Sequence, residues 1–132
     1  MGDGATSFMV RASAGSLLLE DGVRVPHAWT PEGVRADTAG SGAHFFHLAI
    51  ALCILNDTYR EAQGLGIPVN GVEVTADGGF DEHWVSTGVT YRIRIDSPAD
   101  PAVLAELRNV VDDVAEVPKT VRAGAAVRRV ST

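Results

Sequence analysis

The chain is poor in cysteine, in basic residues and in long apolar runs. Cys53 is the only cysteine among the 132 residues, so no disulfide can form within the chain and nothing points to an oxidising compartment. The 11 lysines and arginines stand against 17 aspartates and glutamates, a net charge of −6. Because no basic cluster offers a track for phosphates, we expect no nucleic-acid-binding function.

The apolar run over 44–55 is far shorter than the roughly 20 residues that a membrane-spanning helix needs. The first residues, MGDGATS, lack the charged and apolar regions of a signal peptide. We therefore expect a cytoplasmic protein. The composition, 45% apolar and 21% charged, is that of an ordinary globular protein, and the length predicts one domain over 1–132.

The order of sequence patterns predicts strands, a long helix, strands, a helix and a strand, which is an α+β domain. The pair Asp21-Gly22 predicts a hairpin turn between the segments 17–20 and 23–25. Ser41 can cap the long helix, and Gly64, Gly66 and Pro68 can end it. The expected segments are N-terminal strands and a loop over 1–40, the long helix over 41–64, strands over 69–95, a second helix over 100–116 ended by Pro118, and a last strand over 121–130.

Cys53 lies in the middle of the long, apolar helix. Spacings of three and four residues place it on one stripe with Phe46, Ile50, Asp57 and Arg60. Burial and a neighbouring carboxylate raise the pKa of a thiol, whereas a guanidinium lowers it. The residue is too far along the helix to gain from the N-terminal dipole. An inert packed thiol and an activated nucleophile therefore both remain open, and activation requires a cation from elsewhere in the fold.

Several motifs occur in a recognisable order. An apolar helix with a central cysteine, 51–53, is followed by the segment 66–77, by the alternating segment 89–95, by Asp100-Pro101, and by a helix that ends with the residues 114–118. This order resembles the osmotically inducible protein C / organic hydroperoxide resistance (OsmC/Ohr) family over most of the chain. The resemblance implies antiparallel sheets wrapped around a long apolar central helix, in an intertwined homodimer with active sites at the subunit interface.

The resemblance also implies roles for individual residues. Cys53 corresponds to the family's peroxidatic cysteine, whose thiolate attacks the peroxide O–O bond and becomes a sulfenic acid. Arg11 is the match for the arginine that stabilises this thiolate, with Arg24 and Arg35 as rivals. An apolar wall for a lipophilic substrate is expected from Phe45, Phe46 and Ile50.

Two positions depart from the family's pattern. The family has a second, resolving cysteine just before a proline at the end of the last helix, and this place reads Glu116-Val117-Pro118 here. The family commonly has an acidic residue at the start of the central helix, where this chain has Gly42-Ala43-His44. The chain thus resembles a divergent member that lacks the second cysteine.

Two functions are consistent with this pattern. The first is a one-cysteine thiol peroxidase that reduces organic hydroperoxides in oxidative-stress defence and depends on an external thiol as reductant. The alternative is a catalytically degenerate OsmC-like dimer that binds a hydrophobic small molecule. Neither hypothesis calls for a metal, another cofactor, a nucleic acid or a membrane.

Overall fold

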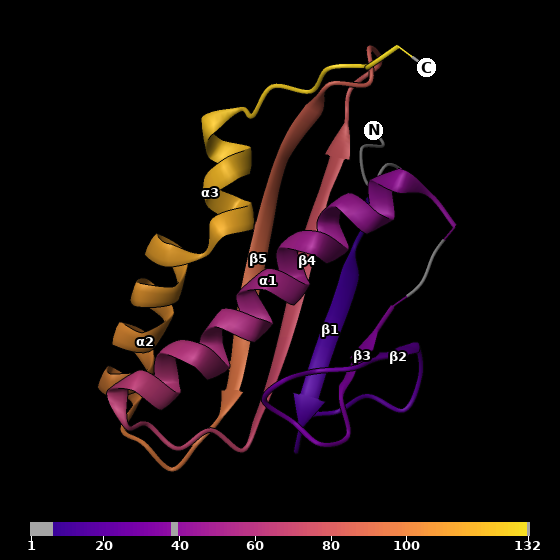
Figure 1. The fold of residues 1–132 in the computed structure, drawn as a ribbon. Helices are drawn as coiled ribbons and strands as arrows, with labels where there is room; N and C mark the ends of the chain where they lie inside the picture. Colours follow the sequence, from indigo (N-terminus) through magenta and orange to yellow (C-terminus); the bar gives the residue numbers. More distant parts are fainter. Residues whose placement is uncertain (1–6, 38–39, 132) are drawn as a thin grey trace.

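The computed structural model describes residues 7–37 and 40–131 (Figure 1). Residues 1–6, 38–39 and 132 of the predicted domain lie outside this part. The helices and strands are, in chain order, β1 Val10–Gly15, β2 Val23–Val25, β3 Val34–Ala36, α1 Gly42–Leu65, β4 Gly71–Phe80, β5 Ser86–Asp96, α2 Pro101–Val114 and α3 Glu116–Ala123. The described residues therefore have an α+β fold.

The strands form one antiparallel sheet in the order β2-β3-β1-β4-β5. Its longest pairing is the β4–β5 hairpin, in which alternate residues of β4 are buried, as expected for a sheet with one covered face. At the hairpin tip, Asp81 accepts hydrogen bonds from the backbone N–H groups of His83 and Val85. This local turn chemistry lets β5 return beside β4 as an edge strand.

Helix α1 crosses one face of the sheet and contacts β1 and β4 (Figure 1). It begins after Ser41, whose hydroxyl accepts the His44 N–H, and it ends at Gly66, which has a left-handed φ of 69°. Small and β-branched strand residues let the helix approach closely. The core between helix and sheet contains Val10, Ala12, Ala14, Val72, Val74 and Ala76 from the strands and Ala51, Ile54 and Leu55 from the helix.

Helices α2 and α3 lie beside α1, next to β5 (Figure 1). Helix α2 turns an apolar stripe toward the core, in which Leu107 and Val111 are fully buried. Within 7–37 and 40–131, no helix combines the length and the hydrophobicity that crossing a membrane requires.

The last strand predicted over 121–130 is wrong. Helix α3 covers Glu116–Ala123, and residues 125–131 have no regular secondary structure. Pro118 does not end the second helix either, because the helical backbone already breaks at Ala115 (φ −62°, ψ 120°). Pro118 lies in the first turn of α3, where its missing N–H is not needed. A strand needs a partner for its backbone groups, and alternation in the sequence does not supply one.

The hairpin predicted at Asp21-Gly22 is also wrong. Residues 17–22 have only turns, bends or irregular structure, and β2 pairs with β3 instead. Gly22 is nevertheless required at this place, because its φ is 96° and a Cβ atom would lie 2.4 Å from the carbonyl oxygen of Ala36. The turn signal thus identified a glycine that the backbone needs, but not the strand that pairs there.

Candidate functional site

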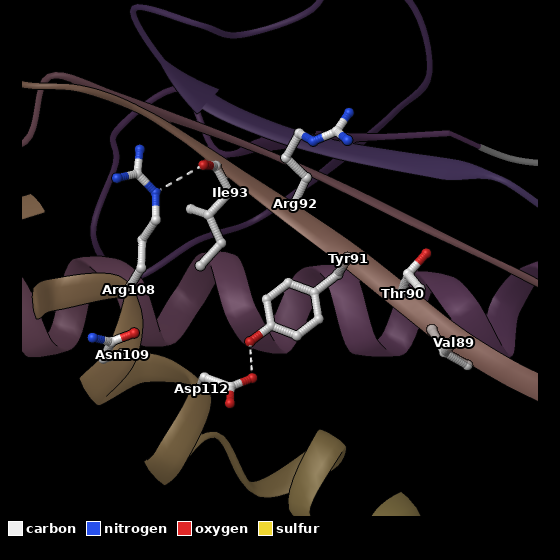
Figure 2. A pocket seen from close by; sticks show the side chains of 8 residues that line it. All are labelled: Val89, Thr90, Tyr91, Arg92, Ile93, Arg108, Asn109 and Asp112. Atoms are coloured by element: carbon white, nitrogen blue, oxygen red, sulfur yellow. Dashed lines mark hydrogen bonds between the residues drawn. The ribbon is translucent and has the colours of Figure 1, made fainter. Parts of the chain in front are cut away.

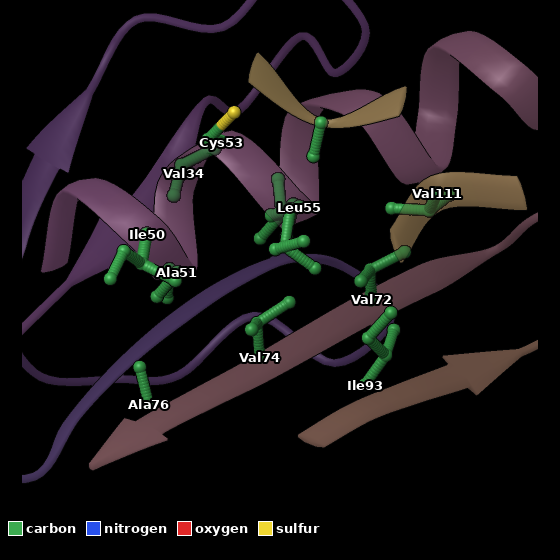
Figure 3. Close-up of a cluster of buried hydrophobic side chains, with 14 of the residues drawn as sticks. Val34, Ile50, Ala51, Cys53, Leu55, Val72, Val74, Ala76, Ile93 and Val111 are labelled. Carbon is green, nitrogen blue, oxygen red and sulfur yellow. The ribbon is translucent and has the colours of Figure 1, made fainter. Parts of the chain in front are cut away.

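Cys53 lies on the side of α1 that faces α3. Its side chain points away from the sheet residues Val74 and Ala76 (Figure 3). The residue is 8% exposed, so the sulfur lies near the surface but is almost covered. Its Sγ atom lies 3.1 Å from Oε1 of Glu116 and 3.9 Å from Oδ2 of Asp57. The fold therefore brings the single thiol between two carboxylates.

Glu116 reaches the thiol because the chain turns sharply between α2 and α3. At this turn Ala115 is fully buried, and its N–H donates to the carbonyl of Val111. Glu116 is then the first residue of α3, where the helix dipole favours an acidic side chain. Its side chain is 63% exposed. The Glu116 carboxylate thus connects a nearly buried thiol to the solvent.

Arg60 pairs with the carboxylates around the thiol. Its Nη2 lies 3.2 Å from Oδ2 of Asp57, and its Nη1 lies 3.9 Å from Oε2 of Glu116. Its Nε also pairs with Oε2 of Glu61 at 3.1 Å. Asp57 is fully buried, so this ion pair compensates a charge that would otherwise be costly in the interior. The Arg60 guanidinium therefore neutralises the two carboxylates, while the thiol donates its hydrogen bond to Glu116.

These surroundings keep the Cys53 thiol protonated. Burial, the main cause, raises its pKa from an ordinary 9.0 to about 12. A hydrogen bond from the Val117 backbone N–H works in the opposite direction, whereas Glu116 and Asp57 raise the pKa further. At a pKa of about 12, roughly one thiol in 10⁵ is ionised at pH 7. Any chemistry at this sulfur needs a way to remove the proton.

Arg11, the expected thiolate stabiliser, lies on the outer face of the sheet and not beside Cys53. Its neighbours on β1, Val10 and Ala12, face the core, so alternation places Arg11 on the opposite face of the sheet. There its Nε pairs with Oδ2 of Asp37 at 3.2 Å. Within one chain, the structure does not bring Arg11 to Cys53.

The two rival arginines also make local contacts in the N-terminal part. Arg24 donates to the carbonyl of Glu32, and Arg35 donates to the carbonyl of Gly22. Neither of these contacts involves the thiol. Arg60 is therefore the arginine that the fold places at the Cys53 cluster, through its two carboxylate partners.

The three residues expected to form an apolar wall lie in different surroundings. Phe45 is 53% exposed, and Phe46 packs edge-on against His47 with 5.1 Å between the ring centroids. Ile50, one helical turn before Cys53, lines a pocket of about 250 Å³ between α1, β5 and α3. The other residues that line this pocket are Ser86, Gly88, Val89, Tyr91, Pro118, Val121 and Arg122.

A larger open groove of about 570 Å³ runs between β5 and α2 (Figure 2). Here the Tyr91 hydroxyl donates to Asp112, and Nη2 of Arg122 pairs with the same carboxylate at 2.8 Å. Burial and the Asp112 carboxylate raise the pKa of Tyr91. Nε of Arg108 donates to the carbonyl of Ile93 at 3.0 Å. These contacts connect β5, α2 and α3, so Tyr91 forms a fixed wall that the groove shares with the smaller pocket.

A metal ion could in principle approach the thiol cluster. The ligand atoms of Cys53, Asp57 and Glu116 lie within 4.8 Å of one another, a spacing that three metal ligands can adopt. Arg60, however, pairs with both carboxylates, and a cation would have to displace its guanidinium. We therefore assign no metal to the cluster, and a metal-free site stays a prediction.

Helical spacing predicts that Asp57 and Arg60 share the Cys53 stripe, but it does not predict Glu116 as a contact of the thiol. The departure from the family pattern at Glu116-Val117-Pro118 was the available signal. The sequence indicates there only the loss of a resolving cysteine, because residue 116 is expected to end the second helix and not to begin a third one. The contact depends on the break at Ala115, which neither composition nor periodicity indicates.

Comparison with known proteins identifies the fold. The chain matches no protein-family model and no curated protein. Among solved structures it is similar to an OsmC-like hydroperoxide resistance protein from Jannaschia sp. CCS1, with a TM-score of 0.63 and 12% sequence identity. The similarity covers 94% of this chain and 92% of that protein. The chain therefore has an OsmC-like fold, as the resemblance in sequence implies, whereas the intertwined homodimer stays a prediction.

Proposed function

We propose that this protein is a one-cysteine thiol peroxidase that reduces organic hydroperoxides, with Cys53 as the residue that attacks the peroxide. The observation that carries the proposal is the position of the thiol. Its Sγ atom lies 3.1 Å from a carboxylate that reaches the solvent. The same two helices, α1 and α3, line an apolar pocket through Ile50 and Pro118.

In the proposed reaction, the sulfur of Cys53 attacks the terminal oxygen of a hydroperoxide. An S–O bond forms and the O–O bond breaks, so the cysteine is oxidised to a sulfenic acid and the hydroperoxide is reduced to an alcohol. Since the chain has no second cysteine, two equivalents of an external thiol return the sulfenic acid to the thiol and release a disulfide and water. No other cofactor is required.

The fold and the pocket both favour this function. The OsmC-like neighbour is a hydroperoxide resistance protein, and this chain carries its single cysteine on the long helix α1. The pocket of about 250 Å³ is lined mainly by apolar side chains, such as Ile50, Val89 and Val121, which suits the hydrocarbon part of an organic hydroperoxide.

The proposal includes a cytoplasmic homodimer that acts in oxidative-stress defence. In such a dimer, α1 is enclosed by sheets from two chains. Because Arg11 lies on the outer face of its own sheet, its proposed role as a thiolate stabiliser requires that it reach Cys53 of a second copy. Phe45 and Phe46, which do not line the Ile50 pocket, contribute to substrate binding only in the same arrangement.

A second function is favoured by the raised pKa of Cys53. A thiol with a pKa of about 12 is a poor nucleophile at neutral pH unless its proton is removed during the reaction. If nothing removes it, the protein is a non-catalytic OsmC-like dimer that binds a hydrophobic small molecule in the pocket lined by Ile50 and Val121.

One experiment separates the two functions. The protein is incubated with cumene hydroperoxide, Cys53 is trapped with a sulfenate-specific reagent, and peroxide loss is followed with a dithiol present. We expect labelling of the wild type, none of Cys53→Ser, and catalytic loss of peroxide only with the wild type. A wild-type protein whose cysteine stays unlabelled in excess peroxide would leave the binding function in place of the peroxidase.

A further inference from the structure

We propose that Glu116 is the catalytic proton acceptor for the Cys53 thiol, an inference that rests on the proposed peroxidase function. The geometry assigns each oxygen of the carboxylate a separate partner. Oε1 accepts the thiol hydrogen bond at 3.1 Å, and Oε2 lies 3.9 Å from Nη1 of Arg60. The contact between sulfur and oxygen is within the distance that direct proton transfer requires.

Asp57, the other carboxylate at the thiol, is less suited to this role. Its Oδ2 is 3.9 Å from the sulfur and 3.2 Å from Nη2 of Arg60. Its Oδ1 accepts a hydrogen bond from Asn56, and its side chain is fully buried. Glu116 lies closer to the sulfur and is 63% exposed, so it can exchange protons with solvent or with a bound reactant.

The proton and electron balance of the step is simple. As the sulfur attacks the terminal oxygen of the hydroperoxide, the S–H proton moves to the Glu116 carboxylate and the O–O bond breaks. The departing alkoxide then takes this proton from Glu116 and leaves as an alcohol. Glu116 ends unchanged, Cys53 ends as a sulfenic acid, and no free thiolate has to accumulate. This explains how a thiol that is protonated in the resting protein can react at neutral pH.

The substitution Glu116→Gln tests the role because two explanations predict opposite results. Glutamine removes the proton acceptor, so we expect sulfenate formation on Cys53 at pH 7 to slow by about 100-fold. A solvent deuterium isotope effect seen in the wild type should disappear as well. If Glu116 only adds negative charge, the same substitution lowers the thiol pKa and accelerates the reaction. An equal or faster rate for Glu116→Gln would overturn the proposal.

Two further variants control the experiment. Glu106→Gln makes the same charge change at an exposed position of α2 and should leave the rate unchanged. Glu116→Ala should recover part of the lost rate when formate is added, because a small carboxylate can take the place of the missing side chain. Failure of formate to raise the rate would count against a proton-transfer role.

Alkylation of Cys53 by iodoacetamide at pH 7 keeps this test separate from the proposed function. The chain has one cysteine, so the label reports on this thiol alone. If wild type forms sulfenate and Glu116→Gln does so equally fast, only the role of Glu116 fails. If the wild type forms no sulfenate, the peroxidase proposal fails, and alkylation alone decides whether Glu116 accepts the thiol proton. Slower alkylation of Glu116→Gln than of the wild type supports this role, and equal or faster alkylation overturns it.

Discussion

Loss of stability at alkaline pH is the most direct test of the buried environment of Cys53. In the unfolded chain the thiol has its ordinary pKa of 9.0, whereas in the folded protein burial raises the pKa to about 12. Above pH 9 the unfolded state therefore binds fewer protons than the folded state. The contribution of this thiol to the free energy of unfolding is fully present below pH 9 and is lost as the pH rises toward 12.

The size of the effect follows from the two pKa values. At pH 10 about ten unfolded thiols are ionised for each protonated one, while the folded thiol remains protonated. The free energy of unfolding should thus be lower at pH 10 than at pH 7 by about 1.4 kcal/mol from this residue alone. Burial also raises the pKa of Tyr59 to about 12, which adds a loss of the same sign.

Cys53→Ser separates the thiol from every other titrating group. Urea unfolding at pH 7 and pH 10, with a reducing agent present, gives the change in free energy of unfolding between the two pH values for each protein. When the two changes are subtracted, the contributions of the tyrosines and any pH-independent cost of the substitution cancel. We expect the wild type to lose about 1.4 kcal/mol more than Cys53→Ser between the two pH values. Equal losses in the two proteins would refute a thiol held protonated by its surroundings.

Two other predictions concern the packing around this helix. Arg60→Met removes the cation beside the buried Asp57 carboxylate and should lower the free energy of unfolding by about 1–2 kcal/mol. This loss is smaller than for a fully buried ion pair, because the Arg60 side chain is 39% exposed. Urea unfolding measures the loss, and an unchanged midpoint would contradict a stabilising ion pair. Gly78→Ala would place a Cβ about as close to the carbonyl oxygen of Gly88 on β5 (2.3 Å) as to Nε2 of His47 on α1 (2.7 Å), and should lower the thermal unfolding midpoint. Gly64→Ala, in open space within α1, should raise the midpoint by stabilising the helix by about 0.5–1 kcal/mol. Equal shifts for the two alanine variants would be inconsistent with the close approach of β5 and His47 to Gly78.

Local signals predicted much of the secondary structure. Ser41 caps the long helix and Gly66 ends it, as expected from the sequence, and Asp100 and Pro101 are the N-cap and the first residue of α2. Each of these depends on the conformational preference of one or two residues, which the sequence displays directly. The predictions that failed, the hairpin at 17–25 and the strand over 121–130, depended on pairing partners. Pairing is a contact between distant segments, and no local pattern specifies it.

Only the part of the candidate site that lies on α1 was predictable from the sequence. The stripe of Cys53, Asp57 and Arg60 follows from helical spacing, because residues three and four apart share a helix face. Glu116 is 63 residues away from Cys53 along the chain and reaches it through the break at Ala115. The family resemblance points to the segment Glu116-Val117-Pro118, but as the place of a missing cysteine and not as the source of a contact with the thiol.

The sequence by itself determined that the chain holds a single thiol on a long apolar helix and that an α+β fold of OsmC-like type was to be expected. Composition, helix caps and apolar periodicity carry the first point and the α+β class, because each acts within a few residues. The OsmC-like type comes from the resemblance in the order of motifs to a known family. Only the tertiary structure decided that the thiol lies between Asp57 and Glu116 and that Arg60, not Arg11, accompanies them within one chain. The pKa of a thiol depends on burial and on charges a few ångströms away, and those distances exist only once α1 and α3 have packed together.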